Sequence, residues 1–119
     1  MSETPVLDTA VLDDLVEHIG ADAVCSIVEI FIGECRELAA TINGAATPQA
    51  VGRAAHSLKS SAGQLGAAAL AEAALAVETA AENNSPALRG CIAALIDCAA
   101  VTEPALVARL EHSRIGWNR

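Results

Sequence analysis

The amino-acid sequence predicts an all-α protein, an antiparallel up-down four-helix bundle with a short extra helix at the N-terminus. Of the 119 residues, 53% are hydrophobic, and much of that fraction is alanine, which is the strongest helix former. The β-branched and aromatic runs that strands favour are scarce, since the chain has one Phe, one Trp and no Tyr. Turn signals divide the chain into five segments joined by short loops, and short loops make consecutive helices antiparallel neighbours.

The first two helices follow from their end signals and from apolar spacing. After an extended lead, a short helix begins near Asp8, a good N-cap, and ends at Gly20, a favoured residue just beyond a helix. A second helix is expected over about 22–43. Its core stripe has near-heptad spacing and consists of Val24, Ile27, Phe31, Cys35, Leu38 and Ile42.

Proline marks the start of two later helices. Thr47 and Ser85 each stand directly before a proline, which is the pattern of an N-cap followed by proline at the first helical position. The remaining helices are therefore expected over about 48–66, 67–82 and 86–112.

Pro104 falls inside the last of these helices. We expect a kink there, or a restart with Thr102 as the cap. We expect one domain over 1–119, with a core of about 5–112 and a frayed tail over 113–119.

The charge balance excludes several classes of partner. The formal net charge is −8 and the pI is near 4.6, which argues against binding to nucleic acid or to an anionic membrane surface.

We expect no apolar run of the roughly 18 residues that a membrane span needs. The N-terminus does not have the pattern of a signal peptide, so we expect a cytoplasmic protein. A bundle of this kind can close on itself, so we expect a monomer.

The four cysteines are expected to be small apolar core residues in a reducing compartment. They are Cys25, Cys35, Cys91 and Cys98, and no two of them form a CxxC pair. Cys91 and Cys98 lie two helical turns apart on one apolar stripe. This pattern favours neither a disulfide framework nor a metal site.

The stretch around His56 carries the candidate site. On a helix, one face holds the apolar residues Val51, Ala54, Ala55, Leu58, Ala62 and Leu65, which must pack inward. The opposite face holds Gln49, Gly52, Arg53, His56, Lys59, Ser60 and Gly63. Small residues on both sides leave the imidazole of His56 uncovered. A glycine inside a helix lowers the stability of that helix by about 1 kcal/mol relative to alanine. Lys59, three residues on, could attract a dianionic group attached to that imidazole.

The distribution of residues around this helix alone leaves open whether His56 is a functional or an ordinary surface histidine. His18 and His112 have no collar of small residues and are expected to be ordinary surface histidines. The sequence contains no HExxH motif, no glycine-rich phosphate loop and no acid or base obviously paired with His56. An accessible nucleophile with a cationic neighbour favours a carrier that other proteins load and unload.

The stretch AHSLKSSAGQLGA, residues 55–67, resembles the signature of histidine-containing phosphotransfer (HPt) domains of bacterial phosphorelays. That signature is roughly A-H-x-L-K-[GS]-[SA]-[SA]-x-x-[LV]-G-A. The resemblance extends over about 5–110, including an acidic second helix and the segment LAVETA in the fourth.

The resemblance implies that His56 is phosphorylated on its imidazole and that Lys59 helps to hold the phosphoryl group. The surrounding site surface is implied to comprise Gly52, Ser60, Gly63, Gln64 and Glu78. Serine at position 60 departs from the commoner glycine but is still small. Glu78 is a candidate for orienting the imidazole, and a solvated helix position is an equally good interpretation. Ser61 falls on the buried flank and is expected to bond to its own helix backbone.

The resemblance also implies the mechanism and the partners. A receiver domain, with Mg²⁺ and a phospho-aspartate in its acidic pocket, would carry the transfer machinery, so this chain would be no enzyme and would bind no cofactor or metal. Docking is expected to use apolar side chains of the first two helices, namely Val11, Leu12, Val24 and Ile27. The same residues could instead close the core.

Three functions remain open at this point. The chain could be a stand-alone phosphorelay carrier, as its initial Met and its tail suggest, or the phosphotransfer domain of a larger hybrid or chemotaxis-type kinase. It could also be a helical interaction or scaffold module that is never phosphorylated. A catalytic histidine kinase is not expected, because His56 is not followed by the H-E-x-[RK]-x-P pattern and there is no room for an ATP-binding domain.

Overall fold

The computed structural model describes residues 4–45 and 47–117, with side chains described as far as residue 111. The described residues form five helices and no strand, so the all-α prediction is confirmed. The helices are α1 (Thr9–Ile19), α2 (Ala21–Gly44), α3 (Pro48–Gln64), α4 (Ala68–Glu82) and α5 (Leu88–Trp117).

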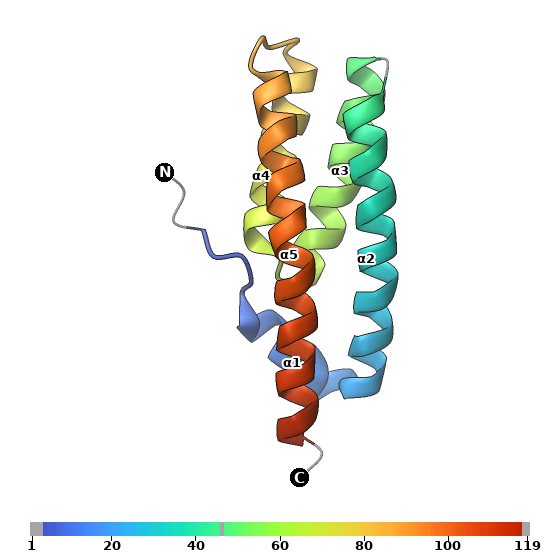
Figure 1. The fold of residues 1–119 in the computed structure, drawn as a ribbon, viewed down its shortest axis with the longest axis vertical. Coiled ribbons are helices and arrows are strands. Elements are labelled where there is room, and N and C mark those ends of the chain that lie inside the picture. Colours follow the sequence, from blue (N-terminus) through green and yellow to red (C-terminus); the bar gives the residue numbers. More distant parts are fainter. Residues whose placement is uncertain (1–3, 46, 118–119) are drawn as a thin grey trace.

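Helices α2 to α5 enclose the core. Each packs against the next along the chain, and α5 also packs against α2, while α1 packs on α2. Figure 1 shows that α2 and α5 follow the long axis of the molecule, with the shorter α3 and α4 beside one half of them and α1 near the other end. Helices α3 and α4 form the most extensive of these contacts, and this pair carries the candidate site.

Capping side chains fix the starts of α1 and α3. Asp8 accepts a hydrogen bond from the N–H two residues on (3.2 Å), and Thr47 accepts one from the N–H three residues on (3.2 Å). Both were expected from the sequence. Ser85 likewise accepts from an N–H two residues on (3.1 Å), but α5 begins at Leu88 rather than at Pro86.

Helix α5 continues through Pro104 and ends later than expected. Thr102 does not cap a new helix, because its hydroxyl donates to the carbonyl of Cys98 in the same helix (2.7 Å). The helix runs on to Trp117, whereas we expected it to end near residue 112.

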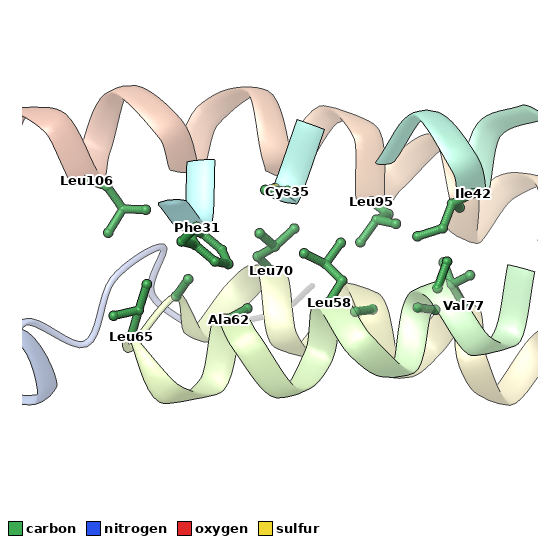
Figure 2. Packing of buried hydrophobic residues seen from close by; sticks show 14 of the residues in the cluster. Phe31, Cys35, Ile42, Leu58, Ala62, Leu65, Leu70, Val77, Leu95 and Leu106 are labelled. Carbon is green, nitrogen blue, oxygen red and sulfur yellow. The ribbon is translucent and has the colours of Figure 1, made fainter. Parts of the chain in front are cut away.

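The core contains the whole inner face predicted for α3, where Val51, Ala54, Ala55, Leu58, Ala62 and Leu65 are all buried. Figure 2 shows Leu58, Ala62 and Leu65 facing side chains of α2 and α5. In α2 the predicted stripe is wrong at one position, since Val28 is buried and Ile27 is 40% exposed. The inward residues of α2 follow a regular alternation of four and three positions, namely Val24, Val28, Phe31, Cys35, Leu38 and Ile42. Position 28 fits this alternation and position 27 does not.

The lead segment and α1 are attached to the turn between α3 and α4. The N–H of Asp8 donates to the carbonyl of Gly66 (2.7 Å), and the N–H of Ala69 donates to the carbonyl of Pro5 (3.0 Å). Gly66 has φ +77°, in the left-handed region that favours glycine. These bonds hold α1 beside the C-terminal end of α3.

The segment Leu88–Glu111 of α5 is long and apolar enough to cross a membrane by length and composition, with a mean hydropathy of 1.8. Our expectation that no such run exists is therefore wrong. One helix of this kind is weak evidence for a span. In the structure α5 packs on α2 and α4, and Arg109 bonds to Asp13 of α1 (2.7 Å).

All four cysteines are free, and Cys35 is the most buried of them. Burial raises the pKa of the Cys35 thiol, and the nearby Glu103, Cys98 and Glu34 raise it further. Within the described part of the chain, no group of three His, Cys, Asp or Glu side chains is placed to hold a metal ion.

Candidate functional site

His56 stands on the outer face of α3 with 64% of its side chain exposed. Its neighbour Ala55 and, two positions on, Leu58 are fully buried, so the helical period turns His56 away from the core. Ser60 and Gly63 are exposed, and no atom outside the helix backbone lies within 4 Å of a Cβ built on Gly63. The small residues predicted around the imidazole therefore do leave it open to a large partner.

Glu78 of α4 contacts the imidazole of His56. The Nδ1 atom of His56 lies 2.6 Å from Oε2 of Glu78, whose side chain is only 13% exposed. A solvated position for Glu78, which the sequence left equally open, is excluded by this burial. The close packing of α3 on α4 brings together two residues that are 22 positions apart.

Lys59 bonds to the same carboxylate. Its ammonium donates to Oε1 of Glu78 at 2.6 Å. The hydrogen bond from Lys59 lowers the pKa of Glu78, and the bond from His56 and the charges of both partners lower it further, against the opposing effect of burial. Glu78 is thus an ionised carboxylate that bridges the two side chains predicted for the site.

This bridge determines which nitrogen of the imidazole carries the proton. An ionised carboxylate can only accept hydrogen bonds, so Nδ1 of His56 must be the donor to Glu78. In the neutral ring the other nitrogen, Nε2, then carries the lone pair. Because the side chain is largely exposed, Nε2 is the nucleophilic atom that a partner can reach.

A groove of about 630 Å³ lies on the N-terminal side of His56, between α3 and the end of α4. Its lining consists of Pro48, Gln49, Gly52, Arg53, His56, Ser57, Glu78, Ala81, Glu82 and Asn84. Gly52 thus belongs to the wall of this groove, as its place on the predicted polar face implied. We call it the histidine groove.

A second, smaller hollow of about 220 Å³ lies beyond His56 in the C-terminal direction of α3. It is mostly apolar and is lined by Leu15, Ile27, Ile30, Phe31, Glu34, Ser61, Gln64 and Leu65, from α1, α2 and the end of α3. Ile30 is 68% exposed, which is unusual for a large apolar side chain. We call it the apolar hollow.

The structure corrects the docking residues expected from the sequence. Leu12 and Val24 are buried in the core, so neither can offer its side chain to a partner. Val11 is half-buried, and Ile27 is exposed in the apolar hollow. Sequence reasoning missed Ile30, although an isoleucine outside the core stripe of α2 was a usable signal.

Two polar residues of α3 lie in the apolar hollow rather than beside the imidazole. Gln64 is two turns beyond His56, about 12 Å along the helix axis, and does not line the histidine groove. The hydroxyl of Ser61 donates to Oε1 of Glu34 on α2 (2.9 Å), so the expected bond to its own helix backbone is wrong.

The other histidines are separate from this site. Nδ1 of His18 lies 2.7 Å from the carbonyl of Asp14 within the exposed α1. The side chain of His112 lies outside the described residues.

Comparisons with known proteins give a family match and a structural match. A family model described as "Hpt domain" matches residues 26–112, a range that includes all of α3 and α4. The crystal structure of histidine-containing phosphotransfer protein B (HptB) from Pseudomonas aeruginosa PAO1 has a similar fold, with a TM-score of 0.84. The two sequences are 22% identical, and the match covers 92% of this chain and 98% of that one. No curated protein matches.

Proposed function

The chain belongs to the Hpt domain family, and from this membership we propose that His56 is its phosphoacceptor. Hpt domains are phosphocarriers that exchange phosphoryl groups with receiver domains, so the chain is a histidine phosphotransfer intermediate of a phosphorelay. In our proposal, Nε2 of His56 accepts the phosphoryl group from a receiver aspartate and later gives it to another receiver.

The observation that carries this proposal is the bond between Nδ1 of His56 and Glu78. In the forward step, the lone pair of Nε2 forms a bond to phosphorus. The bond from phosphorus to the aspartate oxygen breaks, and its electron pair stays on the aspartate carboxylate. The ring gains a positive charge and keeps its proton on Nδ1. The carboxylate of Glu78 stabilises this charge and accepts the hydrogen bond from Nδ1. The reverse step uses the same contacts.

Lys59 and the small residues support the same role. The ammonium of Lys59 has three N–H donors, of which Glu78 needs one, so the others remain for the phosphoryl oxygens. Gly52, Ser60 and Gly63 keep bulky side chains away from the imidazole. We assign Glu78 as a positioning residue, because it acts through His56 and Lys59.

The apolar hollow is our candidate for receiver docking. Ile27 and Ile30 offer exposed apolar surface on the C-terminal side of His56, and Leu15 of α1 extends the same wall. Glu34 and Gln64 form a polar edge around it. This set replaces the docking residues that lie in the core.

We further propose that the scaffold is an antiparallel up-down four-helix bundle with α1 outside it, and that 1–119 acts as a monomeric cytoplasmic domain. In this proposal the chain has no catalytic machinery of its own and binds no cofactor. The receiver supplies Mg²⁺ and the charge neutralisation that transfer requires.

A transfer assay tests the proposal. The protein is incubated with labelled phospho-receivers and Mg²⁺, beside His56→Gln and the matched control His18→Gln. We expect acid-labile, alkali-stable label on the wild type and on His18→Gln, and none on His56→Gln. Equal labelling of His56→Gln would place the phosphoacceptor elsewhere. Failure of every receiver of the host to label the wild type would favour a scaffold role.

A further inference from the structure

We propose that Arg53 is a second cation of the phosphoryl site, and that its guanidinium contacts the phosphoryl group on His56 from the histidine groove. This inference rests on the proposed function of His56. It adds a residue to which neither the family signature nor the expected site assigned a role.

The first argument is the balance of charge around the imidazole. Lys59 already forms an ion pair with Glu78, so most of its charge is neutralised before any phosphoryl group arrives. A phosphoryl group adds up to two negative charges, and the histidine groove also contains Glu82. In a chain of net charge −8, a further cation next to the phosphoryl oxygens would offset this repulsion.

The second argument is the position of Arg53. It lies three residues before His56, while Lys59 lies three residues after it, so the two cations flank the imidazole on one helix face. Arg53 is exposed and lines the histidine groove together with His56. Its planar guanidinium can donate two parallel hydrogen bonds to a phosphoryl group, which an ammonium cannot do.

The third argument is that Arg53 is available. Among the described cations, Arg36 is paired with Glu103, Arg109 with Asp13, and Lys59 with Glu78. Arg53 forms no ion pair or side-chain hydrogen bond within the described part of the chain. Arg89 is also without such a partner there, but it lines a different hollow, beside Ile42 and Leu88.

The shape of the groove leaves room for this contact. Gly52 stands beside Arg53 on the groove wall, and a Cβ built on it would meet only the Cβ of Ala81, at 3.7 Å. A long side chain at position 52 would occupy the space between the arginine and the opposite wall. Arg53 therefore contributes hydrogen bonds and charge to the phosphorylated state, and no proton or covalent bond changes at it.

The test is the equilibrium of phosphoryl exchange with one receiver that labels the wild type. The ratio of phospho-carrier to phospho-receiver at equilibrium depends on the stability of phosphohistidine, and contacts made only in the docking complex cancel from it. The variants are Arg53→Gln, Arg53→Lys and the matched control Arg89→Gln, all at the same Mg²⁺ and salt. Circular dichroism and urea unfolding check that each variant is folded.

We expect Arg53→Gln to shift the equilibrium away from the carrier by roughly two- to fivefold, as for one exposed charge pair. Arg53→Lys should recover part of this shift, and Arg89→Gln should match the wild type. A change in transfer rate with an unchanged equilibrium would make Arg53 a docking residue and overturn the proposal. An unchanged equilibrium and rate would overturn it as well, while labelling of the wild type on His56 would leave the proposed function intact. Labelling of the wild type at a residue other than His56 would overturn the proposed function, and the role of Arg53 with it.

Discussion

The Nδ1 atom of His56 lies 2.6 Å from Oε2 of Glu78, across the contact between α3 and α4. This bond connects a largely exposed imidazole to a carboxylate that is largely shielded from water. The packing of two helices thereby sets which ring nitrogen carries the proton. The scaffold and the chemistry of the site are linked through one side chain.

Replacing Glu78 by Gln should slow phosphoryl transfer to His56 about fivefold. A hydrogen bond to a charged group is worth about 1 kcal/mol more than a neutral one, and about 1.4 kcal/mol in the barrier is a factor of ten. Single-turnover transfer from a phospho-receiver measures this rate. Glu82→Gln is the matched control, because Glu82 lines the same groove without a hydrogen bond to His56. Equal rates for the two variants would contradict a positioning role for Glu78.

The same carboxylate should make stability depend on pH in a defined direction. The pKa of Glu78 is lowered in the folded state, chiefly by the hydrogen bond from Lys59. Its ionised form therefore stabilises the fold at pH values above about 4.3, the ordinary pKa of glutamate, and this contribution is lost as the pH falls through the lowered value. Urea unfolding of the wild type and Glu78→Gln should give a difference that is largest near pH 7 and smaller near pH 3. A difference that grows on acidification would contradict this assignment.

Local signals in the sequence predicted most of the fold. Asp8 and Thr47 cap their helices as expected, because a capping side chain bonds within its own turn. The buried and exposed faces of α3 were also predicted, because a single period places His56 opposite Leu58.

The errors arose where the outcome depends on neighbouring helices. Ile27 and Val28 lie on adjacent sides of the α2 stripe, and packing decides which of them is buried. Ser61 bonds to Glu34 of another helix rather than to its own backbone. Local sequence patterns could not predict the ion pair of Glu78 with Lys59 either, because it depends on how α4 is placed against α3.

Substituting Gly66 by Ala should lower the free energy of unfolding by about 2 kcal/mol or more. Gly66 has φ +77°, and a left-handed conformation alone costs other residues about 1–2 kcal/mol. The new Cβ would also lie 2.6 Å from the carbonyl oxygen of Asp8 and 2.9 Å from Cβ of Val11, so α1 would have to move. Urea unfolding measures the loss.

Gly63→Ala is the matched control for this prediction. Gly63 lies within α3, and a Cβ there meets nothing within 4 Å. Alanine should therefore raise the stability by about 1 kcal/mol, the usual difference in helix propensity. If both variants changed stability in the same direction, the backbone conformation of Gly66 would not be the cause.

Replacing Ile30 by Asp should weaken receiver docking while leaving the fold stable. Ile30 is 68% exposed in the apolar hollow, so a carboxylate there remains hydrated and costs the folded chain little. In a complex, the same carboxylate would be buried against apolar surface, and we expect a loss of about tenfold in transfer rate at low receiver concentration. Leu75→Asp is the matched control, since Leu75 is 48% exposed on α4 and lies outside the hollow. An equal loss for Leu75→Asp would mean that added negative charge, rather than the apolar hollow, limits the encounter. An unchanged rate for Ile30→Asp would move the docking surface away from α2.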